Sequence, residues 1–177
     1  RPHVSLGVYE PERIQVCLQA MLLEEHGYKV GDGAIYYAES RERVRNALHA
    51  IGLGLPWTRL TVNLAPGDLP KEGSHFDLPI ALALLAALGA IPADALAAYV
   101  VIGELNLDGT IAAVAGALPA AIGANALGKG LICPAESGPE AAWAGADIDI
   151  LAPRSLIALA NHFRGTQVLS RPEPAIR

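Results

Sequence analysis

The amino-acid sequence predicts a layered domain of the α/β or α+β class, in which helices pack against a small sheet. Three observations lead to this prediction. Short apolar or alternating segments typical of strands are interleaved with segments of helical periodicity, which is the order found in layered α/β domains. Of the residues, 52% are hydrophobic but only 5% are aromatic, so Ala and Leu dominate the apolar mass and favour helices over a small sheet. The length of 177 residues suffices for one domain with its own core.

The first third of the chain is predicted to alternate helix and strand. The expected helices are Pro11–His26 and Glu39–Leu53, and the expected strands are Gly33–Ala38 and Arg59–Pro66. In the second helix Val44, Leu48 and Ile51 are apolar at helical spacing, which indicates one buried face. The last strand alternates apolar and polar residues, as a half-buried strand does.

The remaining two thirds continue this alternation. An apolar helix is expected at Leu78–Pro92, followed by a hairpin in Ala97–Ile111 that turns at Asp108-Gly109. The later elements are a helix at Gly116–Gly128 closed by Gly128, a strand at Gly130–Ala135, a short helix at Gly138–Gly145, a strand at Asp147–Pro153, and a helix at Ser155–Phe163 with Ser155 as its N-cap.

Composition excludes several classes of function. The net charge of -5 gives no global attraction for nucleic acid, although a local basic patch remains open. Cys17 and Cys133 are not spaced as metal ligands. We therefore expect two buried thiols and no metal site. No apolar run is long enough to span a bilayer and no signal peptide is visible, so we expect a cytoplasmic location and no membrane partner. The chain opens on Arg1 and closes on a Pro-rich tail, so we expect it to belong to a longer protein.

A charged, glycine-bearing turn directly before the apolar helix is the candidate site. Its residues are Lys71, Glu72, Gly73, Ser74, His75 and Asp77. A hydrolytic triad is disfavoured, because side chains this close at a helix entrance fan outward instead of converging on one atom. We interpret the turn as a helix N-terminus, with Ser74 or Asp77 capping exposed amides and Asp77 at the positive end of the helix dipole. A loop that binds an anion or a backbone at the same N-terminus is the alternative.

Longer strings around this turn resemble one family. The stretches ESRERVRNALHAIGL, LPKEGSHFDLPIALALLAALGAIP, VVIGELNLDGTIAAVAGALPAAIGA and NHFRGTQVLSRPEP are similar to the N-terminal domain of the ComM/YifB family, which are magnesium-chelatase-like AAA+ proteins. The resemblance covers Glu39–Arg177. It implies the fold of the Lon-protease C-terminal domain, a βαβ layer domain like domain 2 of a ribosomal small-subunit protein, with its first strands replaced. Residues 39–165 would form this domain and residues 166–177 a linker toward an AAA+ domain outside the chain.

The Lon resemblance bears directly on the candidate turn. Lon-type proteases carry their nucleophile as the Ser of a PKDGPSAG turn, and that Ser falls on His75 here. Their general-base Lys falls on or beside Ala120. Both members of the Ser–Lys dyad are therefore absent, and a lone hydroxyl at Ser74 is a weak nucleophile without a base. The resemblance implies a domain with no catalytic residue, and a Lon-like peptidase is an alternative that the missing dyad disfavours.

No nucleotide-binding loop of the form GxxxxGK[ST] is present. The nearest string, Gly123–Gly130, lacks the final Ser or Thr and follows a helix instead of a strand. We therefore expect no cofactor in this chain. The resemblance places ATP and Mg²⁺ in the missing AAA+ domain of the parent.

The front of the chain resembles a different family. The strings IQVCLQAMLLEE and GAIYYA are similar to the C-terminal part of RecB-like CRISPR adaptation nucleases of the PD-(D/E)xK class, over residues 1–45. Gln15 matches a helix glutamine near their active site, but the metal-binding carboxylates would lie upstream, so no nuclease site is expected. The domain boundary is expected after Ala38. A crossover, an assembly join and a designed chimera are all open as origins of this junction.

The resemblances predict a non-catalytic N-terminal module of a ComM/YifB-type AAA+ ATPase, a DNA-processing motor in recombination and natural transformation. The alternatives are a fragment of the RecB-like nuclease and the Lon-like peptidase. The implied partners are the AAA+ domain of the parent, a homo-oligomeric ring of the parent and, weakly, DNA.

A basic surface is the candidate contact for DNA. The candidate residues are Arg41, Arg45 and Lys71, with Arg43 and Arg59 in the same half of the chain. Arginines on an exposed helix often contact phosphates, but they also keep helices soluble. Glu39 and Glu42 lie among them and can pair with them, so a solvated face is the competing interpretation.

Overall fold

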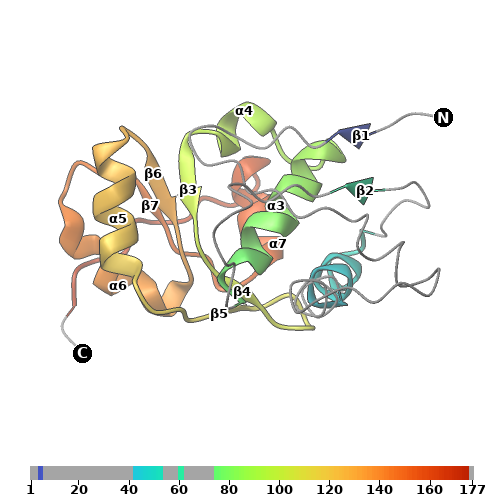
Figure 1. Ribbon diagram of the computed structural model, residues 1–177, viewed down its shortest axis with the longest axis horizontal. Coiled ribbons are helices and arrows are strands. Elements are labelled where there is room, and N and C mark those ends of the chain that lie inside the picture. The colour runs from blue at the N-terminus through green and yellow to red at the C-terminus, as the bar shows by residue number, and fades with distance from the viewer. Residues whose placement is uncertain (1–3, 6–41, 54–59, 62–73, 176–177) are drawn as a thin grey trace, which may run out of the picture.

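The computed structural model describes residues 4–5, 42–53, 60–61 and 74–175. A parallel sheet of three strands lies at the centre of the C-terminal half (Figure 1). Its strands, in spatial order, are β3 (Tyr99–Val101), β6 (Gly130–Ile132) and β7 (Ile150–Leu151). Tyr99 pairs with Gly130 and Leu131 with Ile150, and parallel neighbours of this kind require crossover connections.

Helices cover both faces of this sheet. The crossovers α5 (Ala117–Ala126) and α6 (Gly138–Ala141) lie on one face, while α3 (Asp77–Ala87) and α7 (Leu156–Phe163) lie on the other (Figure 1). On β6 the side chain of Ile132 joins the α3 and α7 cluster, whereas Leu131 joins the α5 and α6 cluster. This alternation builds three layers, and it confirms the predicted α/β class.

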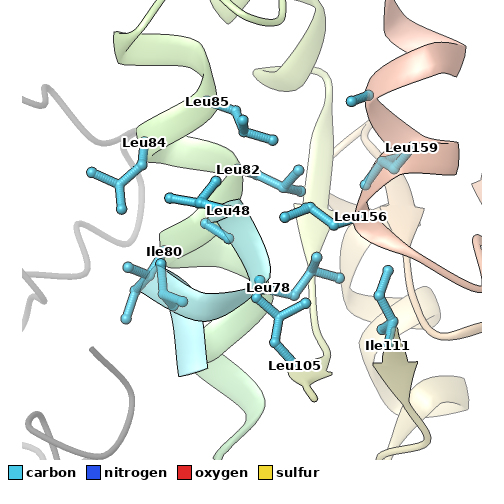
Figure 2. Close-up of a cluster of buried hydrophobic side chains, with 14 of the residues drawn as sticks. Leu48, Leu78, Ile80, Leu82, Leu84, Leu85, Leu105, Ile111, Leu156 and Leu159 are labelled. Carbon is cyan, nitrogen blue, oxygen red and sulfur yellow. The ribbon is translucent and has the colours of Figure 1, made fainter. Parts of the chain in front are cut away.

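Helix α3 is buried because its sequence is apolar on all sides. Seven of its eleven residues are buried, so it has no solvent-facing stripe of the ordinary amphipathic kind. Leu78, Leu82 and Leu85 point from α3 toward Leu156 and Leu159 of α7 (Figure 2). Each fully buried leucine of this kind stabilises the fold by about 1.5–3 kcal/mol.

The predicted helix Glu39–Leu53 is confirmed where the structure describes it. Residues 42–50 are helical, and Val44, Ala47 and Leu48 are buried in the same cluster as α3 (Figure 2). The strand predicted at Arg59–Pro66 contains β2 (Leu60–Thr61), which pairs in parallel with β1 (Val4–Ser5). Strand β1 was not predicted. The predicted elements Pro11–His26 and Gly33–Ala38 lie outside the described residues.

Four helices end on the same hydrogen-bonded motif with a glycine in the left-handed region. The glycines are Gly52, Gly89, Gly128 and Gly165. At the end of α5 the N–H of Gly128 donates to the carbonyl of Asn125, and the N–H of Lys129 donates to the carbonyl of Ala124. Because only glycine adopts this conformation at no steric cost, the predicted helix end at Gly128 is confirmed.

The turn of the predicted hairpin is present, and the hairpin docks on the start of α7. The single strand expected before the turn is divided into β3, which joins the parallel sheet, and a separate short strand that forms the hairpin. Strands β4 (Glu104–Leu105) and β5 (Ile111–Ala112) are antiparallel, and Gly109 turns between them with a φ of +84°. The carbonyl of Gly109 accepts a hydrogen bond from the N–H of Leu156. Ser155 caps α7 as predicted, because its Oγ accepts from the N–H of Ala158 at 3.3 Å.

Two differences from prediction concern short helices. The apolar helix ends at Ala87, and a separate helix α4 (Ala93–Leu96) begins after Pro92, whose extended backbone cannot continue a helix. The single helix expected at Gly138–Gly145 is split into α6 and the 3-10 helix η3 (Ala142–Ala144), preceded by η2 (Ala135–Ser137). Within the described ranges, every helix is too short or too polar to cross a membrane.

Candidate functional site

The candidate turn forms a 3-10 helix that leads directly into α3. Residues Ser74–Phe76 make up η1, and α3 starts at Asp77. Phe76 holds the N-cap position without a side-chain cap hydrogen bond, so the prediction that Ser74 or Asp77 is the N-cap of α3 is wrong. The other half of that prediction is confirmed, because Asp77 lies in the first turn, where the helix dipole favours a negative charge. Lys71, Glu72 and Gly73 lie outside the described residues.

Two backbone hydrogen bonds hold this turn against Gly103, which lies between β3 and β4. The N–H of Gly103 donates to the carbonyl of His75 at 3.2 Å, and the N–H of Leu78 donates to the carbonyl of Gly103 at 3.1 Å. A Cβ on residue 103 would lie 2.7 Å from Cδ2 of Leu78, so any larger residue would require the Leu78 side chain to shift. The turn is therefore part of the packed domain.

An ion cluster ties three segments together at the start of α3. Arg43, from the helix over 42–50, places Nε 3.1 Å from Oδ2 of Asp77 and Nη1 3.0 Å from Oε1 of Glu104 on β4. The side chain of Asp77 is 0% exposed, that of Arg43 is 24% exposed and that of Glu104 is 32% exposed. A carboxylate buried this deeply requires a cation beside it, and Arg43 supplies that charge.

The geometry gives Asp77 a structural role. A carboxylate that orients a catalytic base must be within hydrogen-bond reach of that base, and Asp77 is instead paired with a guanidinium. The side chain of His75 is exposed. Ala120 lies on α5 and packs against the cluster on the opposite face of the sheet from α3. The structure thus brings Asp77 and Arg43 together, and leaves Ala120 in a different layer.

Two of the arginines considered for DNA contact, Arg43 and Arg45, make ion pairs within the domain. Arg43, which lies in the same half of the chain as the candidate DNA contacts, belongs to the ion cluster and pairs with two carboxylates. Arg45 pairs with Glu42 at 2.6 Å as predicted, and both side chains are about half exposed (50% and 53%). An exposed pair of this kind contributes little to stability and exchanges readily for another partner. Arg41 and Arg59 lie outside the described residues.

Sequence analysis missed the partnership of Arg43 with Asp77. A signal was available, because Asp77 directly precedes a run of apolar residues that must be buried. A carboxylate at such a position needs a cation or several N–H donors nearby. Which of the arginines supplies the charge depends on the packing of the 42–50 helix against α3, and spacing along the chain does not define it.

Two further candidates are structural. Cys133 is a free, fully buried thiol, as predicted, and burial together with the negative charge of Glu140 raises its pKa to about 12. Residues Gly123–Gly130 form the last turn of α5 and lead into β6. A phosphate-binding loop has the reverse order, strand before helix. Among the described residues, no three His, Cys, Asp or Glu side chains group as a metal site would require.

The sequence of this chain is similar to one protein family and to several bacterial proteins. Residues 29–137 match the family described as subunit ChlI of Mg-chelatase. The YifB protein of Escherichia coli is 39% identical over 136 residues, which cover 77% of this chain and 27% of YifB. The competence protein ComM of Haemophilus influenzae is 43% identical over 103 residues, which cover 58% of this chain and 20% of ComM.

A relative of another class also matches. The CRISPR-associated exonuclease Cas4 of Rhodospirillum rubrum is 61% identical over 79 residues, covering 42% of this chain and 23% of the exonuclease. This stretch is longer than the resemblance to RecB-like nucleases expected over residues 1–45. The chain spans about a quarter of the length of the relatives it matches first.

Proposed function

Because the chain belongs to the family of subunit ChlI of Mg-chelatase, we propose that it is a non-catalytic module of a ComM/YifB-type AAA+ protein that processes DNA. Residues 39–165 form the module, with the fold of the Lon-protease C-terminal domain. ATP and Mg²⁺ belong to the AAA+ domain of the parent, which assembles as a ring. The name of the competence protein ComM supports a role in DNA uptake or recombination.

One observation carries the non-catalytic part of this proposal. Asp77 carries the carboxylate of the candidate turn that could act as an acid or a base. Its side chain is fully buried and paired with Arg43. The turn is also hydrogen-bonded to both the N–H and the carbonyl of Gly103. These contacts hold the start of α3 in place. A turn fixed in this way serves as a scaffold, because the carboxylate of Asp77 is already engaged in an ion pair with Arg43.

A chimera tests the role of the turn. In a Haemophilus influenzae strain that lacks ComM, a ComM gene would carry residues 39–165 of this chain in place of the matching segment. We expect this chimera to restore transformation by exogenous DNA. The variants Ser74→Ala and His75→Ala should leave the transformation frequency within about threefold of the parent chimera, since a scaffold needs neither side chain. Circular dichroism and protein abundance are measured for each variant.

Arg43→Met provides the matched comparison, because it disturbs the same turn without removing a hydroxyl or an imidazole. We expect it to lower both abundance and transformation. If Ser74→Ala or His75→Ala abolishes transformation while the protein stays folded and abundant, the turn is catalytic and the proposal is wrong.

DNA contact by this module is a separate part of the proposal. Arg41 and Arg45 are the proposed contacts, with Lys71 on the adjacent turn. Few phosphates could be neutralised by so small a set, so binding to single-stranded DNA should be weak and should disappear at high salt. Fluorescence anisotropy across a salt series measures it. Binding that is unchanged in an Arg41→Ala, Arg45→Ala double variant would exclude this surface.

A second candidate function is supported by the match to the exonuclease of Rhodospirillum rubrum. A nuclease of this class would cleave single-stranded DNA with Mn²⁺ or Mg²⁺ and lose activity in a chelator. Under the module proposal we expect no cleavage of labelled single-stranded DNA by this chain. Chelator-sensitive cleavage that Gln15→Ala reduces would favour the nuclease.

A further inference from the structure

The segment after α7 has no regular secondary structure and yet contacts the domain at several points. We call residues 167–175 the C-terminal strap. Its first anchor is Leu169, whose side chain packs against the α3 and α7 cluster. The N–H of Leu169 also donates to Nδ1 of His162 at 3.1 Å. The strap therefore turns back onto α7 directly after that helix ends.

The second anchor is an arginine bound to main-chain carbonyls. The guanidinium of Arg171 donates from Nη1 to the carbonyl of Ala146 at 2.7 Å and from Nη2 to the carbonyl of Gly145. These two carbonyls directly follow η3. Hydrogen bonds donated by a charged guanidinium are stronger than those between neutral groups, and two of them fix the orientation of the side chain.

The last anchors lie on α6 and η3. A Cβ on Gly138 would lie 3.0 Å from Cβ of Pro172, so Pro172 packs directly over the first residue of α6. The indole N–H of Trp143 donates to the carbonyl of Ala175 at 3.3 Å, and the Trp143 side chain is 54% exposed. Figure 1 shows the chain leaving the molecule beside α6.

We propose that the C-terminal strap is a structural part of the domain and fixes the direction in which the chain leaves it. The residues 166–177 were expected to be a linker, and a linker would make no regular set of contacts with what it follows. Here apolar packing, two charge-assisted hydrogen bonds and an indole hydrogen bond occur within seven residues, from Leu169 to Ala175. Release of residues 169–175 from the domain requires all of them to break.

This assignment has a mechanical meaning that rests on the proposed function. Under that proposal, movement of a further domain of the parent would reach α6 and η3 through the strap, because the strap contacts both of these elements. A flexible tether would leave the module unaffected by such movement. The strap thus makes the module responsive to the domain it is joined to.

Hydrogen exchange of the present chain, measured by NMR, tests the strap directly. We expect the indole N–H of Trp143 and the amide N–H of Leu169 to exchange about tenfold or more slowly than in an unstructured peptide. Trp143→Phe identifies the indole signal, since Trp57 is the other tryptophan. Arg171→Ala should return the Trp143 indole to the unprotected rate while the amides of α5 keep theirs.

Arg154→Ala is the matched control, because it removes an exposed arginine outside the strap and should leave the Trp143 indole protected. Arg171→Lys keeps the charge but loses the paired donors, and should give intermediate protection. Unprotected exchange at both probes in the unaltered chain overturns the proposal, as does an equal effect of Arg171→Ala and Arg154→Ala. Either result leaves the chimera test of the proposed function unaffected, because that test concerns residues 39–165.

Discussion

Arg43 is the residue at which the 42–50 helix, α3 and β4 converge. Its two ion pairs differ in surroundings, because Asp77 is fully buried whereas Glu104 reaches the surface. Removal of the arginine would leave the carboxylate of Asp77 in an apolar cluster with its main positive neighbour gone. The cost of that uncompensated charge, and not the strength of the pair itself, determines what a mutation does.

We predict that Arg43→Met lowers the free energy of unfolding by about 3 kcal/mol, measured by urea denaturation. Arg45→Met removes an exposed arginine from the same helix and should change stability by about 0.5 kcal/mol or less. Adding Asp77→Asn to Arg43→Met should recover part of the loss, since the buried charge is then gone. Equal effects of Arg43→Met and Arg45→Met would contradict the structural role of the cluster.

Cys133 makes stability depend on pH in the alkaline range. Burial raises the pKa of its thiol to about 12, whereas an exposed thiol in the unfolded chain titrates near its ordinary value of about 8.5. The stabilisation is therefore complete below the unfolded pKa and is lost progressively as the pH rises toward the folded pKa. At pH 10 the loss should be about 1.5–2 kcal/mol.

The measurement is urea denaturation at pH 7.5 and pH 10 for the unaltered chain and for Cys133→Ala. We expect the pH-dependent change in the free energy of unfolding to be smaller in the variant by the stated amount. Other groups titrate in the same range, and the comparison with the variant removes their contribution. A variant with the same pH dependence as the unaltered chain would show that the thiol is solvated.

The glycines of the domain differ in the space that surrounds them, and therefore in whether a side chain could be added. Gly123 lies in the interior of α5, where an added Cβ meets nothing within 4 Å. The glycine therefore affects stability only through its greater backbone conformational entropy in the unfolded chain. Gly103 lies where the start of α3 meets β4, and an added Cβ collides with Leu78. The same substitution should therefore act in opposite directions at the two positions.

We predict that Gly123→Ala raises the free energy of unfolding by about 0.5–1 kcal/mol. Gly103→Ala should lower it by about 1–3 kcal/mol, since Leu78 is fully buried and must move. Thermal denaturation followed by circular dichroism measures both variants. A gain in stability from Gly103→Ala would mean that the contact between Leu78 and residue 103 is looser than the structure shows.

Elements with a strong local signal were predictable from the sequence. The end of α5 at Gly128, the cap of α7 at Ser155 and the hairpin turn at Asp108-Gly109 each depend on one residue type that few alternatives can replace. The short helices α4, α6 and η3 were not predictable in this detail, because helices of three or four residues have no periodicity to detect. They form where the chain packs against α3 and α5, which is a tertiary effect.

The whole domain is organised around one sheet with a hydrophobic cluster on each face. Strand β6 contributes Ile132 to one cluster and Leu131 to the other, so neither cluster can come apart without disturbing the same strand. The two layers of helices should therefore unfold together as one cooperative unit.

We predict that Leu159→Ala, in the α3 and α7 cluster, destabilises both faces equally, by about 2–5 kcal/mol. Native-state hydrogen exchange measures this as an equal loss of protection for the slowest amides of α3 and of α5. Exchange in α5 that stays unchanged would show that the two faces open independently.

At the scale of the molecule, the sequence predicted the class of fold but not the geometry of the candidate site. The resemblance and the helix-start interpretation placed Asp77 at the start of α3, and the structure agrees. The pairing of Asp77 with Arg43 joins residues that are far apart in the chain, and only the packing of two helices brings them together. The docking of residues 167–175 was also beyond sequence reasoning, because a Pro-rich composition is common to linkers and to bound extended segments.

The position of the C-terminal strap in the chain has a consequence for protein synthesis. Everything that the strap touches, from Gly138 and Trp143 to His162, is translated before the strap itself. The ribosomal exit tunnel keeps the newest residues away from the folded part, so the sheet and its helices can assemble on the nascent chain while the strap is still enclosed. Closure of Arg171 on the carbonyls after η3 should then follow the assembly of the sheet and its helices, because the strap is the later part to leave the tunnel.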